Sequence, residues 1–395
     1  MFYKSYKIRL FPTKEQEEMF YKHIGCCRVV WNFMLNAQIK TRNEEGKYLS
    51  EFGMINILPK LKKDENYLWL SEVSNKSLEI ICSDLFKAFK RFFSGKSKYP
   101  KYKTKKKSKK AFPVRPDSFY LLDDVCNIEK IGKVKYKTNY ILPIGRNMAK
   151  FINPRISLVH GKWILTVTLE CENQTQEYLS GKMGIDLGIK RLAVVSFRNE
   201  DGEVNYIVDN INKSKEFIRL KCKLKHLRRK LSRKYRVNGS YDRTKNIDKV
   251  IKQINDIEYH LSNKRLEYIY KIINKFLDLN PEVVTMENLA IKNLLKNKRL
   301  APSIHEACWY EFRHIMEYKC EHKGIKFQLA GRFFPSTKLC SCCGHKKKKM
   351  PLKKREYKCK KCGLFIDRDV NAAINLREYN PEYRNKKKSK KKNKA

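Results

Sequence analysis

Hydrophobic and basic side chains alternate over residues 2–10, and this period of two predicts a β-strand with one basic face. Thr13 and Gln16 stand three positions apart and have the form of a capping box, which predicts the first turn of a helix. Apolar residues then recur at helical spacing as far as about Met34. The chain is therefore expected to begin with a strand followed by an amphipathic helix.

A second amphipathic helix is predicted over residues 74–92, with apolar residues on one face and cations on the other. These cations could contact phosphate groups or could form an ordinary solvated face. We favour phosphate contact because the whole chain is strongly basic. The cations are Lys76, Lys87, Lys90 and Arg91. A basic linker that contains tyrosines follows over residues 96–110.

The pattern changes to short strands over residues 112–170, which predicts a small β-domain. The clearest strands are 155–159 and 162–170, and the His160–Gly161 pair between them is typical of a tight hairpin. The polar segment 171–180 forms a natural boundary before the next domain.

Residues 181–196 predict a buried strand that turns into a second strand, because apolar residues alternate and glycines interrupt them at Gly184 and Gly188. Asp186 lies in the middle of this apolar segment. A buried acid is costly unless it is paired or bound to a cation. On this segment alone, Asp186 is explained equally well as a residue that caps a turn and as a metal ligand.

Two long helices are predicted over residues 213–235 and 241–279, with leucines on one side and many cations on the other. They form either a solvated helical hairpin or an arm that contacts nucleic acid, and we favour the arm. Pro281 ends the second helix. Residues 282–287 then predict a short buried strand that again ends on a carboxylate, that of Glu287.

The last third of the chain predicts a helix over about 303–323 and a strand over 325–329. The terminal run 385–395 is rich in lysine and of low complexity, so we expect a disordered tail. Such a tail adds either to non-specific binding or only to solubility.

The net charge indicates which class of partner the protein binds. The chain has 395 residues, and its 88 Lys and Arg against 41 Asp and Glu give a formal net charge of +47. Such an excess repels itself unless a polyanion neutralises it, and nucleic acid is the commonest polyanion. A membrane surface is a weaker explanation, because the sequence has neither a transmembrane segment nor an apolar signal core. We expect a cytoplasmic protein that associates with nucleic acid.

Four cysteines form two CxxC pairs separated by 15 residues. The pairs are Cys340 with Cys343 and Cys359 with Cys362. This spacing predicts a structural zinc site with four thiolate ligands, and an odd total of 13 cysteines does not suit a disulfide framework. Cys342 could compete with Cys343, but it would leave an unusual CxC loop, so we assign Cys343.

A third group of acids follows directly after the cysteines. Asp367, Asp369 and Asn371 occur at a spacing of two, just before a helical pattern begins. Asp369 or Asn371 could simply be a helix N-cap. Together with the acids at 186 and 287, however, a third carboxylate could hold two Mg²⁺ ions against a scissile phosphate.

Six segments of this sequence, in this order, resemble the TnpB (OrfB) proteins of bacterial insertion sequences, which are RNA-guided nucleases related to type V CRISPR effectors. The segments are YKIRLFPTKEQEEMF with GCCRVVWN, MGIDLGIKRLAVVS, VVTMENLAIKNL, RFFPSTKLCSCCG, and YKCKKCGLFIDRDVNAAINL. The resemblance extends over nearly the whole chain. It departs from the family in Cys342 and in the lysine-rich ribbon tip and tail.

The resemblance implies an α/β fold with a ribonuclease H-like RuvC nuclease, in which Asp186, Glu287 and Asp369 are the catalytic acids, with Asp367 as an uncertain neighbour. The implied domains are a β-barrel wedge, a helical recognition lobe and the nuclease, with a helical insertion, an inserted zinc ribbon and the basic tail. Their ranges are 1–10 with 112–179 (wedge), 11–111 (lobe), 180–395 (nuclease), 213–279 (insertion), 336–366 (ribbon) and 385–395 (tail).

The family also implies the partners and the chemistry. The expected partners are a guide RNA from the end of the mobile element and a double-stranded DNA target beside a short adjacent motif, which the helix at 74–92 would help to read. The expected activity is cleavage of DNA phosphodiester bonds with two Mg²⁺ ions, and one Zn²⁺ would be structural. The alternatives are a catalytically silent guided DNA-binding regulator and an accessory transposase.

Overall fold

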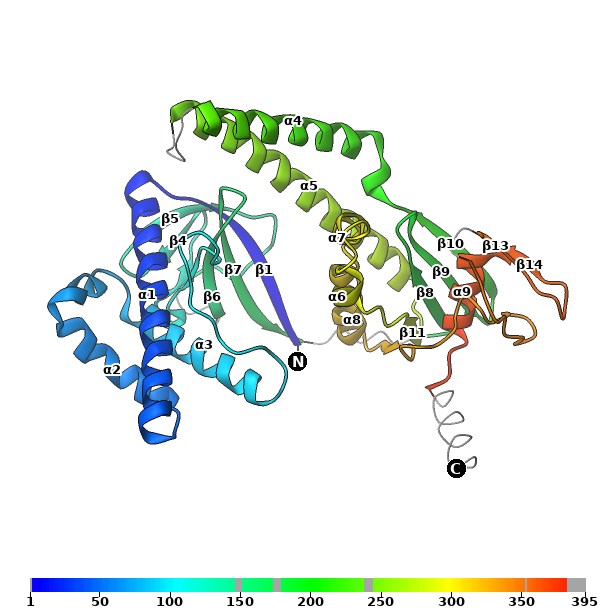
Figure 1. The fold of residues 1–395 in the computed structure, drawn as a ribbon, viewed down its shortest axis with the longest axis horizontal. Coiled ribbons are helices and arrows are strands. Elements are labelled where there is room, and N and C mark those ends of the chain that lie inside the picture. Colours follow the sequence, from blue (N-terminus) through cyan, green and yellow to red (C-terminus); the bar gives the residue numbers. More distant parts are fainter. Residues whose placement is uncertain (1, 146–150, 173–178, 238–243, 352–353, 382–395) are drawn as a thin grey trace. The chain divides into compact units, whose positions relative to one another are not determined.

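The computed structural model describes residues 2–145, 151–172, 179–237, 244–351 and 354–381. The predicted tail at 385–395 lies outside these residues. The chain divides into two compact units, Met1–Glu172 and Asn173–Ala395 (Figure 1). Among the described helices, none is long and apolar enough to cross a membrane.

The first unit contains an antiparallel sheet in which seven described strands have the order β2-β6-β7-β1-β5-β4-β3. The strands are β1 (Phe2–Phe11), β2 (Ala111–Pro113), β3 (Tyr120–Leu121), β4 (Val125–Ile128), β5 (Gly132–Lys137), β6 (Ile152–Val159) and β7 (Lys162–Cys171). The predicted alternation of β1 is present, because Ile8 and Leu10 are fully buried while its lysines are exposed. The left-handed residues His160 and Gly161 make the hairpin between β6 and β7.

Three helices gather at one side of this sheet (Figure 1). They are α1 (Lys14–Glu45), α2 (Glu51–Lys63) and α3 (Asn75–Phe93). The capping box starts α1, since Thr13 Oγ1 accepts from Gln16 N at 3.3 Å and Gln16 Oε1 accepts from Thr13 N at 3.1 Å. The pattern analysis did not predict α2 or the 3₁₀ helix Glu65–Glu72 that follows it, and it ended α1 about ten residues too early.

The second unit is built on a sheet of order β10-β9-β8-β11-β12. Its strands are β8 (Lys182–Leu187), β9 (Arg191–Asn199), β10 (Gly202–Asp209), β11 (Val283–Met286) and β12 (Lys326–Leu329). Strands β8, β9 and β10 form an antiparallel meander, whereas β11 is parallel to both β8 and β12. Parallel strands need long crossover connections, and helices supply them here.

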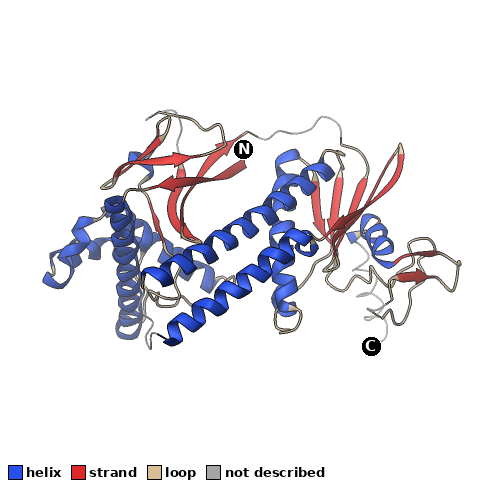
Figure 2. Cartoon of the chain, turned by 90° about the horizontal axis from the view of Figure 1, so that it is seen from above, coloured by secondary structure: helices blue, strands red, loops and turns tan. Residues whose placement is uncertain are grey.

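Helices cover both faces of this second sheet. The helices are α4 (Lys215–Val237), α5 (Lys245–Leu277), α6 (Ile291–Leu294), α7 (Ala301–Ala307), α8 (Trp309–Lys323) and α9 (Arg368–Arg377). Met183 and Ile185 of β8 pack into a core shared with α8 and the end of α5. The opposite face of β8 and β9 packs against α9. Figure 2 shows α4 and α5 running side by side as a helical hairpin, joined by their own apolar contacts.

One helix prediction is wrong in detail. The segment 303–323 was expected to form a single helix, but the structure has two helices, α7 and α8. Cys308 separates them in a left-handed conformation, with φ of 52°. Such a residue cannot continue the right-handed hydrogen-bond ladder, so the helix restarts at Trp309.

Candidate active site and metal centre

Two predicted acids meet at one edge of the second sheet. Asp186 lies in β8 and Glu287 directly follows β11, and the register of these parallel strands pairs Ile185 with Met286. The next residue on each strand is therefore the acid, and both acids lie at the carboxyl ends of neighbouring strands. The parallel pairing, which the sequence pattern does not reveal, is what brings together residues 101 positions apart in the chain.

The carboxyl groups of Asp186 and Glu287 lie within hydrogen-bonding reach of each other. Burial raises the pKa of Asp186 well above its usual value, and the negative charges of Glu287 and Asp369 add to the effect. Burial also raises the pKa of Glu287. Like charges in a desolvated site destabilise one another, and a divalent cation would remove that repulsion.

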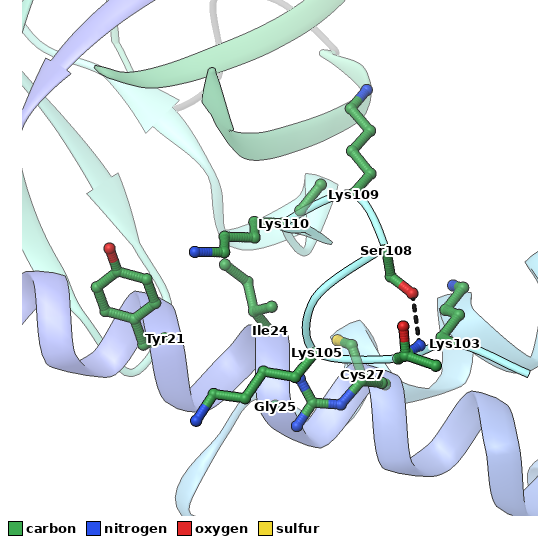
Figure 3. Close-up of a pocket in the computed structure, with 12 residues that line it drawn as sticks. Tyr21, Ile24, Gly25, Cys27, Lys103, Lys105, Ser108, Lys109 and Lys110 are labelled. Atoms are coloured by element: carbon green, nitrogen blue, oxygen red, sulfur yellow. Dashed lines mark hydrogen bonds between the residues drawn. The ribbon is translucent and has the colours of Figure 1, made fainter. Parts of the chain in front are cut away.

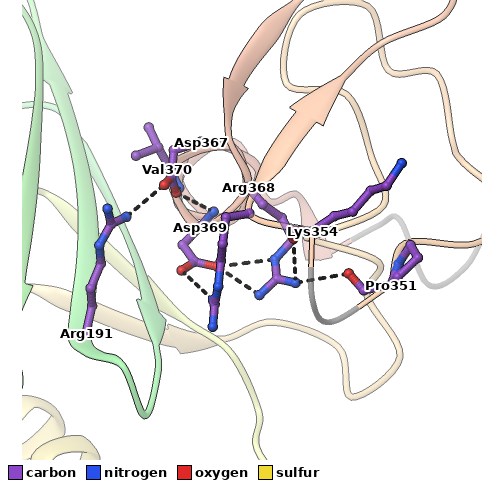
Figure 4. Close-up of polar contacts among 8 residues, drawn as sticks. Arg191, Pro351, Lys354, Asp367, Arg368, Asp369 and Val370 are labelled. Atoms are coloured by element: carbon purple, nitrogen blue, oxygen red, sulfur yellow. Dashed lines mark hydrogen bonds and ion pairs between the residues drawn. The ribbon is translucent and has the colours of Figure 1, made fainter.

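The third acid, Asp369, comes from the first turn of α9, and its position is fixed by Asp367 (Figure 4). Asp367 is the N-cap of α9, because its Oδ1 accepts from Asp369 N at 2.8 Å and from Val370 N at 3.3 Å. Its other oxygen, Oδ2, accepts from Arg191 Nη1 at 2.9 Å. The suggestion that Asp369 or Asn371 caps the helix is therefore wrong: Asp367 does so.

Two arginines hold the Asp369 carboxylate. Arg368 Nη2 lies 3.2 Å from its Oδ1, and Arg355 Nη1 lies 3.3 Å from its Oδ2. Arg368 is buried and also donates to Lys354 O at 3.1 Å, so its guanidinium is itself held in place (Figure 4). Among the described residues, the four cysteines and not the three acids form the group whose ligand atoms all lie within 4.8 Å of one another. Asp369 thus lies beside the acid pair without completing a compact cluster.

Close packing of α9 on β8 places Asp369 beside this pair. Gly184 and Asp186 point to the same face of β8, because side chains alternate along a strand. A Cβ at Gly184 would lie 2.1 Å from Ala373 O and 2.2 Å from Arg377 N. Only glycine permits this approach of helix and strand. In the sequence, Gly184 only interrupts a strand pattern. That interruption does not reveal that a helix packs against the glycine.

The sequence analysis missed the buried polar contacts of three residues of α9, and it considered one of them, Asn371, only as a helix cap. Asn371 is fully buried, accepts from Ser341 N at 3.0 Å and donates to Leu339 O at 2.7 Å. Asn375 donates to Ser336 O and Leu339 O, each at 2.8 Å. The buried Arg377 donates to Ser196 Oγ at 2.8 Å and pairs with Glu203 at 2.9 Å. A polar residue on the buried face of a short helix is the signal that could have found them.

The cysteine segment forms a small separate substructure with two strands, β13 (Glu356–Lys358) and β14 (Phe365–Asp367). Its four predicted ligand cysteines converge, with Sγ–Sγ distances of 3.6 Å for Cys340 with Cys362 and for Cys343 with Cys359. A zinc tetrahedron with metal–sulfur bonds of about 2.3 Å has edges of about 3.8 Å, whereas a disulfide needs about 2.05 Å.

The thiols of this cluster differ in acidity, and burial raises the pKa of Cys340 to about 12. Hydrogen bonds from backbone amides, that of Cys362 first, lower the pKa of the Cys359 thiol to about 6. Thiolates are the form that binds zinc. Cys342 is exposed and lies outside the cluster, so the structure places Cys343 in it, as the loop argument predicted. The four cysteines could hold one zinc ion.

The predicted cations of α3 lie on its exposed side, opposite its buried apolar face. Lys76 forms an ion pair with Glu79 at 3.0 Å, and Lys90 Nζ lies 5.4 Å from the centre of the Phe86 ring. Lys87 and Arg91 are exposed. This arrangement suits contact with phosphates and equally suits a solvated helix, so their role stays a prediction.

Two protein-family profiles match parts of this chain. A profile described as Cas12f1-like, TNB domain matches residues 309–376, and one described as a helix-turn-helix domain matches residues 1–47. In this structure the latter segment is a strand and one uninterrupted helix. A protein of Streptomyces pristinaespiralis named "Putative RNA-guided DNA endonuclease" is 32% identical over 94% of this chain and 88% of its own length. The chain belongs to the TnpB family.

Other relatives agree with this assignment of the TnpB chain. An Escherichia coli K12 protein with the same descriptive name is 26% identical over 94% of this chain and 91% of its own length. A TnpB-like protein of Acanthamoeba polyphaga mimivirus is 24% identical over 95% and 73%. The fold resembles Cas12f1 as solved in complex with sgRNA and target DNA, with a TM-score of 0.52 and 16% identity over 96% of this chain and 99% of that one. The mixed α/β fold of this TnpB protein is therefore that of the Cas12 effectors.

Proposed function

We propose that this TnpB protein is an RNA-guided DNA endonuclease that requires a divalent metal, most simply Mg²⁺. The single observation that carries the nuclease assignment is the contact between the Asp186 and Glu287 carboxyl groups at the carboxyl edge of β8 and β11, with Asp369 beside them. Carboxylates supply the hard oxygen ligands that Mg²⁺ prefers, and three of them lie near this edge of the sheet. RNA guidance is supported by the names of the relatives and by the net charge of +47.

The proposed chemistry assigns separate tasks to the residues present. When bound, two Mg²⁺ ions would activate a water and stabilise the leaving oxygen of the cleaved phosphodiester. Asp186 and Glu287 would hold these ions through their carboxylate oxygens. Asp369 would complete the ligand set, with Arg368 orienting its carboxylate and Asp367 fixing the helix turn that carries it.

We also propose the domain assignment that the family resemblance implies: a wedge over 1–10 and 112–179, a recognition lobe over 11–111, and a RuvC-like nuclease over 180–395 with a zinc ribbon over 336–366. The division of the chain between Glu172 and Asn173 supports the boundary before the nuclease. The sheet of β8 to β12 with acids at its edge supports the ribonuclease H-like assignment, and the cysteine cluster supports the ribbon.

The test is to purify the protein with its bound RNA, sequence that RNA, and offer duplex DNA that matches it in the presence of Mg²⁺. The proposal expects cleavage of matching DNA and none of unmatched DNA. Protection of matching DNA without cleavage would instead establish the guided regulator, and strand-transfer products would establish the transposase. Absence of any co-purifying RNA would overturn the guided assignment.

A further inference from the structure

A pocket of about 390 Å³ lies in the first unit, between α1 and the basic segment that precedes β2 (Figure 3). Helix α1 contributes five residues to its wall, one of which is Cys27. The other four, Tyr21, Ile24, Gly25 and Arg28, are at positions i, i+3, i+4 and i+7, so they form one stripe along the helix. The opposite wall is made by residues between Lys103 and Ala111, and none of the proposed catalytic or zinc-binding residues is near this site in the sequence.

The lining of this pocket is strongly cationic. Five of its twelve residues are basic and none is acidic. The cations are Arg28, Lys103, Lys105, Lys109 and Lys110. Cations gathered around one cavity without acids repel each other, and an anion placed among them relieves that repulsion. The pocket therefore has the charge of an anion site.

Hydrogen bonds within the basic segment hold it in a defined turn. Thr104 N donates to Ser108 Oγ at 2.7 Å, a bond drawn in Figure 3, and Lys107 N donates to Thr104 Oγ1 at 3.2 Å. The Lys103 backbone is fixed to α1, because Lys103 N donates to Asn32 Oδ1 at 2.7 Å and Asn32 Nδ2 donates to Lys103 O at 2.9 Å. These bonds fix the backbone of the turn beside α1. Lys103 Nζ lies 3.6 Å from the centre of the Trp31 ring, and Figure 3 shows the Lys109 side chain pointing away from α1.

Gly25 leaves the α1 side of the pocket open. It lies inside the long helix α1, where glycine is less favourable than alanine. A Cβ built at Gly25 would meet no heavy atom within 4 Å, so the packing of the chain does not require a glycine here. The missing side chain instead leaves room at the floor of the pocket, as expected where the backbone must be approached closely by a ligand.

We propose that this pocket binds one unpaired nucleotide of the RNA that the protein carries. Arg28 and Lys105 would contact its phosphate, since guanidinium and ammonium groups bind phosphate through charge-assisted hydrogen bonds. Tyr21 and Ile24 supply the apolar side against which a base can lie. A paired nucleotide is excluded, because its base is stacked inside a duplex that is wider than this cavity. The ligand identity rests on the proposed function, whereas the pocket and its charge do not.

The test uses the full chain produced in cells and purified with its RNA. Irradiation with short-wavelength ultraviolet light links unmodified bases of every kind to protein, and mass spectrometry then locates the adducts. We expect adducts on peptides that contain Tyr21 or the 103–111 turn. Their yield should fall as the side chain at position 25 grows from glycine through Gly25→Ala to Gly25→Leu, because leucine fills the pocket without changing any charge.

A matched pair of double variants separates the pocket from general electrostatic attraction. Lys105→Ala with Lys110→Ala removes two lysines that line the pocket, whereas Lys106→Ala with Lys107→Ala removes two exposed lysines of the same turn that do not. The first pair should lower the pocket adducts by about fivefold or more, and the second should leave them near the wild-type yield. Equal losses in both pairs, or full adduct yield in a folded Gly25→Leu variant, would overturn the proposal.

This result is independent of cleavage. A protein that fails to cut DNA but yields the pocket adducts loses the proposed nuclease function and keeps the nucleotide site. A protein that cuts DNA normally but yields no adducts at this pocket keeps the function and loses the site.

Discussion

Replacing Gly184 with alanine tests whether the packing of α9 on β8 sets the position of the third acid. The new Cβ would lie 2.1 Å from Ala373 O, and 3.4 Å is the beginning of ordinary contact. The clashing atoms, Ala373 O and Arg377 N, belong to the backbone of α9. The helix must therefore move by about 1 Å. We expect this overpacking to lower the free energy of unfolding by about 1–3 kcal/mol. Asp369 moves with the helix, and a displacement of about 1 Å in a catalytic group costs about 100-fold in rate.

The assay measures single-turnover cleavage of matching DNA by the purified complex, together with its melting temperature. Met183→Ala is the control, because Met183 is the neighbouring buried residue of β8 and faces the opposite core. Met183→Ala should lower the free energy of unfolding by about 2–5 kcal/mol. The folded protein should still cleave at close to the wild-type rate. If Gly184→Ala cleaves as fast as Met183→Ala, the argument that this contact positions the acid is refuted.

Three further predictions follow from the same contacts. Cys343→Ser should lose the zinc, whereas Cys342→Ser should retain about one zinc per chain by metal analysis; equal retention in both would contradict the assigned ligand set. Arg368→Gln should lower cleavage by about 10–100-fold and raise the Mg²⁺ concentration needed, with RNA binding intact, because Arg368 only orients a ligand; an unchanged metal requirement would exclude that role. Burial raises the pKa of Asp186 and Glu287. Without metal, the fold should therefore lose stability as rising pH ionises these two acids, and cleavage should decline as falling pH protonates them. Asp186→Asn should therefore melt higher than wild type at neutral pH without metal, and the two should converge below about pH 4; a lower melting temperature at neutral pH would contradict the repulsion argument.

The local elements of this chain could largely be predicted from sequence, because their signals are short-range. The capping box of Thr13, the alternation of β1 and the CxxC spacing each depend on residues a few positions apart, and the structure contains the corresponding helix start, strand and cysteine cluster. Helix α2 was missed because its sequence carries an internal proline, Pro59, and no long apolar stripe. Cys308 gave no local signal that it would break a helix.

The site was harder to predict, because its geometry depends on contacts between distant segments. The sequence indicated three acids, but only the parallel pairing of β8 with β11 shows that Asp186 and Glu287 touch. The capping role of Asp367 and the arginine contacts of Asp369 arise from a helix start and a ribbon that meet in space. No pattern of spacing along the chain could have revealed these contacts.

The central claim is that the carboxylates of Asp186, Glu287 and Asp369 catalyse DNA cleavage. It is tested most directly by replacing Asp186 with alanine and comparing RNA content, target binding and cleavage with the wild-type complex under the same Mg²⁺ conditions. The account predicts that the variant co-purifies with the same RNA and binds matching DNA but does not cut it. Cleavage at the wild-type rate by Asp186→Ala would contradict the account.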